Sequence, residues 1–156
     1  MKAWWIALVL IACGAPARGR IGYVVTATDD TPSGRAAVGR AIGAGDDVAG
    51  DGFVMRLDDA GRARVAATAG VAAVRPIVAD EKLGKLPDTS PVSVRIDLYD
   101  DATPAELDAV AAWIAAHGGS VGAKAARSID ATIATSMLHA LAETAEVRWI
   151  EALEAR

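Results

Sequence analysis

An internal repeat is the feature of this sequence that most limits how the chain can fold. Residues 68–74 read TAGVAAV and residues 144–150 read TAEVRWI, so Thr, Ala and Val recur in the same places and an aliphatic residue follows three positions later. Upstream, Ala37-Val38 matches Ala109-Val110 at an offset of 72 residues, whereas the closing fragments match at an offset of 76. The second copy therefore carries a net insertion of four residues, and we expect one structural module used twice.

The second copy has the clearer pattern. Residues 92–98 alternate apolar and polar side chains, which is the period of a half-buried strand. Thr103-Pro104 with Glu106 predicts a capping box with proline at the first position of a helix. The remaining elements are expected to be two strands over residues 120–127 and 128–135, a helix with Ser136 as its N-cap, and a last strand over residues 147–153.

The first copy shows the same order of elements. This order predicts an α+β protein made of two tandem ferredoxin-like βαββαβ modules, each a four-stranded antiparallel sheet with two helices on one face. The modules are expected over residues 21–78 and 92–156, joined by a polar, proline-containing linker over residues 79–91. Each module has a small core and one bare sheet face, so we expect the two modules to pack on each other or to share a partner.

The N-terminal residues have the pattern of an export signal. Residues 1–12 begin with one Lys and continue as an apolar run that is about half as long as the ~20 residues of a spanning helix. The run ends in Leu10-Ile11-Ala12-Cys13, which resembles the lipobox of bacterial lipoproteins. We therefore expect lipidation at Cys13, a tether over residues 13–20, and a lipid-anchored place in the cell envelope, on the periplasmic or surface side of a bacterial membrane. A plain secretory signal cut near residues 14–17 is the alternative.

Composition excludes several classes of function. The chain is 53% apolar, has a formal charge of −4 and contains only 4% aromatic residues, so it lacks both the basic surface and the stacking platform of a nucleic-acid-binding protein. Paired acids such as Asp29-Asp30 and Asp100-Asp101 fall at turns and helix starts, where they cap backbone donors. His117 and His139 are expected at a helix end and on a helix surface. We expect no catalytic group, no metal site and no cofactor.

A longer segment carries a family resemblance. Residues 52–76, GFVMRLDDAGRARVAATAGVAAVRP, resemble the second half of the propeptide domain of subtilisin-type serine proteases, which also occurs free-standing as a proteinase inhibitor. Gly52-Phe53 matches the start of the family's strand, and Gly70-Val71 with Val74 matches its last strand. Residues 117–119 and 147–151 of the second copy are similar to the same pattern, so the resemblance covers two tandem domains.

The resemblance implies a way of binding. In that family the open sheet face lies on two surface helices of the protease, and an acidic residue after the last strand caps the N-termini of those helices. Glu151 stands at the matching place, whereas Arg75 occupies it in the first copy. The implied partner-binding residues are Glu151 with Trp149, Leu153 and Arg156, although the tail after Glu151 is shorter than the one that the family inserts into the substrate cleft.

The expected function is therefore that of a non-catalytic exported lipoprotein. We expect it to bind a subtilisin-like serine protease by sheet-face docking, to inhibit that protease or assist its folding, and to contact the membrane through its lipid. A cell-envelope interaction scaffold with no protease partner is the alternative. Binding of a small ligand between the two modules is a third reading that rests on fold analogy alone.

Overall fold

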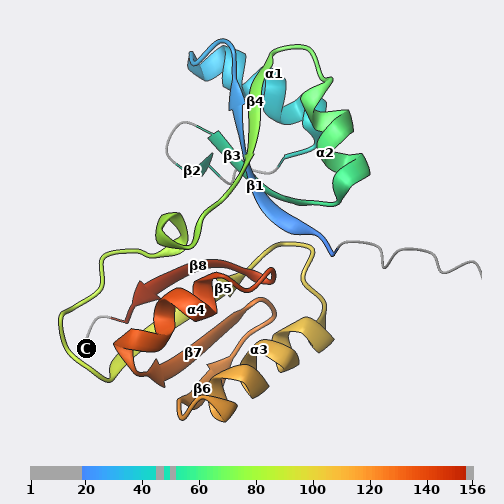
Figure 1. Cartoon of the computed structure of the whole chain (residues 1–156). Helices are drawn as coiled ribbons and strands as arrows, with labels where there is room; N and C mark the ends of the chain where they lie inside the picture. The colour runs from blue at the N-terminus through green and yellow to red at the C-terminus, as the bar shows by residue number, and fades with distance from the viewer. Residues whose placement is uncertain (1–18, 45–47, 50–51, 154–156) are drawn as a thin grey trace, which may run out of the picture.

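The computed structural model describes residues 19–44, 48–49 and 52–153, which form an α+β structure with two antiparallel sheets (Figure 1). The first half of the chain builds one sheet with strands between Ile21 and Pro76, and the second half builds the other with strands between Val92 and Ala152. Among the described residues, two α-helices belong to each half.

The first sheet has the strand order β2-β3-β1-β4, and neighbouring strands are antiparallel. Its edge strand β2 contains only two residues, so the sheet consists mainly of β3, β1 and β4. The elements of the first half are β1 (Ile21–Ala27), α1 (Pro32–Ile42), β2 (Val48–Ala49), β3 (Gly52–Leu57), α2 (Asp59–Ala66) and β4 (Val71–Pro76).

The second sheet has the corresponding order β6-β7-β5-β8, again with antiparallel neighbours. Between the two halves lies a single 3-10 turn, η1 (Ala79–Lys82). The elements of the second half are β5 (Val92–Leu98), α3 (Pro104–Ala116), β6 (Ser120–Lys124), β7 (Ser128–Ile133), the 3-10 turn η2 (Thr135–Met137), α4 (Leu138–Ala142) and β8 (Val147–Ala152).

The sequence repeat is visible in the hydrogen bonding of the strands. The register between β1 and β4 shifts between Thr26 and Ala27. The register between β5 and β8 shifts at the corresponding step, between Asp97 and Leu98. The two sheets thus share a register irregularity at corresponding steps, which is what one module used twice would produce.

Helix α3 begins as the sequence predicts, and helix α4 does not. The Thr31 hydroxyl accepts the Gly34 N–H at 3.2 Å at the start of α1, and Thr103 forms the predicted capping box with Glu106 at the start of α3. Ser136 was expected to cap the last helix, but the turn η2 precedes α4 and no side chain caps that helix. Just before this helix the chain contacts the linker, because the Thr135 hydroxyl donates to the Thr89 carbonyl at 2.7 Å.

Each sheet carries its two helices on one face, and the two cores differ greatly in size. Among the described residues of the first half, the buried core cluster is small and consists of Val25, Val38, Phe53 and Val65. The second half buries a much larger set from all of β5, β7, β8, α3 and α4, including Val94, Ile96, Ile114, Ile129, Leu141 and Ile150. Because burial of apolar area is the main driving force of folding, the second half supplies most of the stability of the chain.

The segment expected as a linker, residues 79–91, packs along the second half. Leu83 forms a parallel bridge with Ile150, and the Gly84 N–H donates to the Ile150 carbonyl at 2.8 Å. Leu83 and Leu86 also pack against the second core. These contacts cover part of the free edge of β8.

The described ranges contain no helix that is both long and apolar enough to cross a membrane. The predicted signal peptide, the lipidation site Cys13 and most of the predicted tether lie outside the described residues, as does Arg156.

Candidate functional site

The side of the second sheet that carries no helix is the candidate partner-binding face. Strand residues alternate across a sheet, and the inward residues of β5, β7 and β8 are buried in the core. Their outward neighbours are all exposed or only partly buried: Ser93, Arg95, Asp97, Ser128, Asp130, Thr132, Trp149 and Glu151. We call this set the open face of the second sheet.

Two residues predicted to bind a partner lie on this face. Ile150 is completely buried, so Trp149 and Glu151 on either side of it point outward. Trp149 lies opposite Asp97 in the register, and Glu151 lies opposite Arg95. Glu151 is exposed, which leaves its carboxylate available to a partner.

Leu153, the third predicted residue, follows directly after β8. Its N–H donates to the Ser93 carbonyl at 2.9 Å, which continues the pairing with β5 beyond the end of the assigned strand. The structure thus brings Trp149, Glu151 and Leu153 together along one edge of the sheet, while Arg156 cannot be placed.

A charge network runs across the middle of the open face. Arg95 donates from Nε and Nη2 to the two Asp130 carboxylate oxygens at 2.9 and 3.2 Å. This bond, followed by the charges of Asp130, Asp97 and Glu151, raises the pKa of Arg95 above its usual value. Burial raises the pKa of Asp97, while the positive charge of Arg148 opposes the rise and Glu151 adds to it. The face therefore carries both signs of charge, with one partly buried indole at its edge.

Gly84 fixes how closely the linker approaches Trp149. A Cβ at Gly84 would lie 3.2 Å from Trp149 Cζ2 and 3.2 Å from the Ile150 carbonyl oxygen. Both distances are shorter than ordinary van der Waals contact, so a side chain at Gly84 would displace the indole or the linker slightly. The linker thus helps to hold Trp149 in place.

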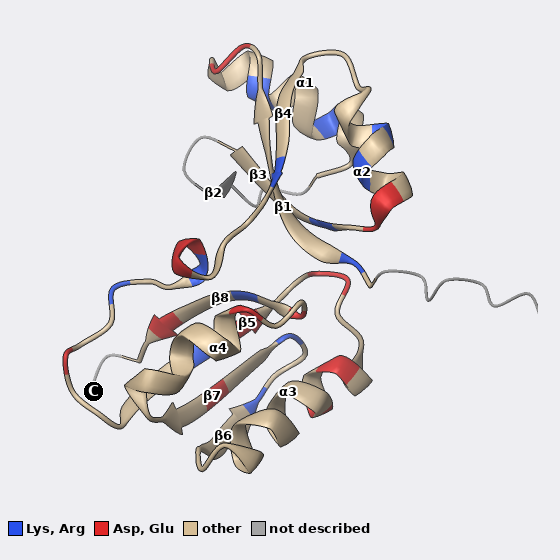
Figure 2. Ribbon diagram, in the orientation of Figure 1, with Lys and Arg blue, Asp and Glu red and all other residues tan. Residues whose placement is uncertain are grey.

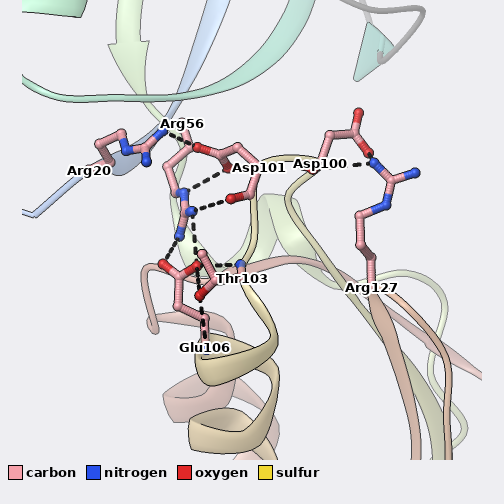
Figure 3. A network of polar contacts seen from close by, with 7 residues as sticks. All are labelled: Arg20, Arg56, Asp100, Asp101, Thr103, Glu106 and Arg127. Atoms are coloured by element: carbon pink, nitrogen blue, oxygen red, sulfur yellow. Dashed lines mark hydrogen bonds and ion pairs between the residues drawn. The ribbon is translucent and has the colours of Figure 1, made fainter.

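A second cluster of charged residues joins the two halves of the chain. Figure 2 shows basic residues at the start of β1 and on β3, and acidic residues on the β5–α3 connection and at the start of α3. Arg56 of β3 reaches across: its Nε donates to Asp101 at 3.0 Å and its Nη1 to Glu106 at 2.7 Å (Figure 3). Arg20 pairs with the same Asp101. The two halves thus contact each other, which is one of the two outcomes expected from their bare sheet faces, the other being a shared partner.

Arg56 is the most deeply buried member of this cluster. Its side chain is 3% exposed, whereas Asp101 and Glu106 are 35% and 30% exposed. The hydrogen bond from Arg56, followed by the one from the Thr103 N–H, lowers the pKa of Glu106 to about 2. Glu106 therefore serves the cap of α3 and the contact between the halves with one carboxylate.

Tyr99 and Lys82 form the buried part of the same contact. Tyr99 is 3% and Lys82 4% exposed, and the Lys82 Nζ donates to the Thr144 carbonyl at 3.0 Å. Burial lowers the pKa of Lys82 to about 8, against the effect of Glu146, and burial raises the pKa of Tyr99 to about 12. Among the buried side-chain atoms of the described residues, the Tyr99 hydroxyl alone lacks a hydrogen-bond partner.

Sequence reasoning missed Arg56, Tyr99 and Lys82. An arginine at an outward strand position has the same pattern as any solvated residue, and Lys82 falls in a polar segment. The available signal was weak: Tyr99 directly follows an alternating strand and precedes the acidic pair Asp100-Asp101, which places an aromatic ring beside two carboxylates.

A shallow pocket of 330 Å³ lies between residues 77–82 and α4. His139 is 58% exposed, as predicted for a helix surface, and lies 3.6 Å from Asp80 and 3.7 Å from Glu143. These side chains can pair with one another when His139 is protonated, and their exposure makes such pairs weak. Within the described residues, no group of three or more His, Cys, Asp or Glu side chains could hold a metal ion.

Comparison with known proteins adds no family assignment. The chain matches no protein-family model, and no curated protein is significantly similar to it. What the chain does must therefore be argued from the open face and from the contact between the halves.

Proposed function

We propose that the chain is a non-catalytic exported lipoprotein that binds a subtilisin-like serine protease through the open face of the second sheet, and inhibits that protease or assists its folding. The observation that carries the proposal is the position of Glu151. Its carboxylate is exposed on an edge strand, on the uncovered side of the sheet, two residues from Trp149.

The fold belongs to the same proposal, which assigns each half to the ferredoxin-like class. The strand order β2-β3-β1-β4 with two helices on one face is the arrangement that a split βαβ motif produces. The order β6-β7-β5-β8 and the repeated bulge support the same assignment for the second half.

The proposed docking depends on the N-terminus of a helix in the protease. The first N–H groups of a helix lack partners within the helix and carry a partial positive charge, so an approaching carboxylate gains hydrogen bonds and dipole energy of about 0.3–2 kcal/mol. Glu151 can provide that carboxylate. Trp149 can provide the aromatic contact that most often anchors a protein interface.

Inhibition assays test this proposal. The full chain, kept in detergent, is mixed with a panel of subtilases, and peptide hydrolysis and complex formation are followed. We expect slowed hydrolysis by at least one enzyme and a weaker effect of the Glu151→Gln variant. Arg75→Gln is the matched control, because Arg75 occupies the corresponding position in the first half. Unchanged rates and no complex at ~10 μM, a concentration at which weak interfaces are populated, would refute the proposal.

An interaction scaffold without a protease partner is the second candidate. It is favoured by the charges of the open face, since Arg95 already pairs with Asp130 and offers less to an incoming helix. A pull-down from envelope extract separates the candidates: recovery of a subtilase contradicts the scaffold, and repeated recovery of unrelated envelope proteins supports it.

Membrane attachment through Cys13 is proposed on sequence grounds and is tested separately. Cys13→Ser should move the protein from the membrane fraction to the soluble fraction of the cell envelope. Equal membrane association of both forms would contradict lipid anchoring.

A further inference from the structure

The open face of the first sheet differs from that of the second in what covers it. Gly22, Val24 and Arg56 lie on the first sheet's outward side, since Val25 and Phe53 point into the core. These three residues are nevertheless buried, whereas Thr26 and Val54 on the same side are partly buried. On the second sheet each outward-facing residue described above is exposed or partly buried.

Part of what covers the first sheet is the Tyr99 ring. A methyl group on Gly22 would overlap the Tyr99 hydroxyl and would lie 2.7 Å from Ile77 Cγ2. The glycine is needed here for close approach, because it leaves a notch in the sheet into which the hydroxyl fits.

Two cations hold the ring in this notch. The Arg56 guanidinium lies 6.0 Å and the Lys82 ammonium 5.9 Å from the ring centre. Such distances allow cation–π attraction, which is strongest where water is excluded. Arg56 comes from the first sheet, Lys82 from the linker and Tyr99 from the second half, so all three segments contribute to one contact.

We infer that the part of the first sheet's open face around Gly22 and Arg56 is an internal receptor for the Tyr99–Glu106 segment, and that an external partner therefore binds the open face of the second sheet. Only the identity of that partner rests on the proposed function. Arg75 stands where the second half has the acidic Glu151. It pairs with Glu81 of the linker at 2.6 Å, which fits a first sheet that binds within the chain.

Nitration of tyrosine in the full chain tests the receptor without any protease. Tetranitromethane attacks exposed phenols at about pH 8, and the two tyrosines of the chain, Tyr23 and Tyr99, are separated by peptide mass analysis. Tyr23 is 6% exposed and lies on the face of β1 that carries Val25, so it reports unfolding of the first half.

We expect Gly22→Ala to speed nitration of Tyr99 about tenfold or more while Tyr23 stays protected. Gly19→Ala is the matched control, because a Cβ at Gly19 would have no atom within 4 Å. Arg56→Met, which removes the cation without adding bulk, should give the same result as Gly22→Ala. The inference is overturned if Tyr99 stays protected in both variants, or if it becomes reactive only together with Tyr23.

Two threonines, one on each sheet, test which open face binds the partner, once a subtilase that binds the chain has been found. Thr26 lies at the uncovered end of the first sheet's open face, and Thr132 lies on the second's. We expect Thr132→Arg to weaken binding about tenfold or more, and Thr26→Arg less than about twofold. Equal losses would overturn the inference that the partner binds the open face of the second sheet. If no subtilase binds, the proposed function fails, while the nitration result still decides the internal receptor.

Discussion

Replacing Arg56 by Met measures how much the contact between the halves stabilises the chain. The Arg56 side chain is 3% exposed, and its shortest bonds run 2.7 Å to Glu106 and 3.0 Å to Asp101. A hydrogen bond to a charged group contributes about 1.5–3 kcal/mol. Both carboxylates are about one third exposed, so water can replace part of the hydrogen bonding that they lose with Arg56. We expect the free energy of unfolding to fall by ~2–4 kcal/mol.

The Arg75–Glu81 pair is the matched control for this variant. It also joins one arginine to one glutamate, with bonds of 2.6 and 2.7 Å, and Arg75 lowers the pKa of Glu81 to about 2. Its side chains are 50% and 37% exposed, however, and solvent screens an exposed pair. We therefore expect Arg75→Met to cost less than ~1 kcal/mol, although Glu81 and Glu106 have similarly lowered pKa values.

A double-mutant cycle with Glu106→Gln isolates the Arg56–Glu106 interaction, with urea unfolding followed by circular dichroism and tryptophan fluorescence. The pKa of Glu106 is lowered from 4.5 to about 2, so its contribution is present above pH 4.5 and is lost as the pH falls through about 2. We expect a coupling energy of ~1–2 kcal/mol at neutral pH that disappears in acid. A neutral-pH coupling below ~0.5 kcal/mol, no larger than that of Arg75 with Glu81, would refute the reasoning.

Further predictions concern Lys82, Gly84 and Thr103. Burial lowers the pKa of Lys82 from 10.5 to about 8, so the cost of its buried charge is fully present below pH 8 and is relieved as the pH rises toward 10.5. Urea titrations should show stability rising by ~2 kcal/mol from about pH 7 to 10 in the unmodified chain but not in Lys82→Met; a parallel rise in both would contradict this. Gly84→Ala should shift the Trp149 indole N–H resonance and cost ~1 kcal/mol, whereas Gly19→Ala should leave that resonance unmoved. Thr103→Ala should lower the free energy of unfolding by ~1 kcal/mol through loss of the capping box, and no change in the urea midpoint would argue against that role.

Much of the fold could be predicted because its signals are local. The helix start at Thr103 follows from a hydroxyl that reaches an N–H three residues away. The outward positions of Trp149 and Glu151 do not follow from the two-residue period alone, because strict alternation from the buried Val147 would turn both inward. The register shift between β5 and β8 turns them outward. The last helix was misplaced because Thr135 bonds to the linker at Thr89, 46 residues away, which no local pattern shows.

The contact between the halves could not be predicted for the same reason. Arg56 and Asp101 are 45 residues apart, and each has the pattern of an ordinary surface charge. Lys82 is the clearest example of burial that the local sequence does not predict. It lies in a polar segment, but it is only 4% exposed and lies beside the Tyr99 ring, which follows β5. Burial of such residues depends on how two separately formed halves meet.

Hydroxyl-radical footprinting of a complex with a subtilase tests whether the open face of the second sheet binds the protease. The chain supplies its own control, because Trp149 lies on the open face of the second sheet, whereas Trp113 lies on α3 and packs against the core from the opposite side. We expect the bound protease to slow oxidation of Trp149 and to leave that of Trp113 unchanged. Protection of Trp113 instead, or oxidation rates that no subtilase alters, would contradict this prediction.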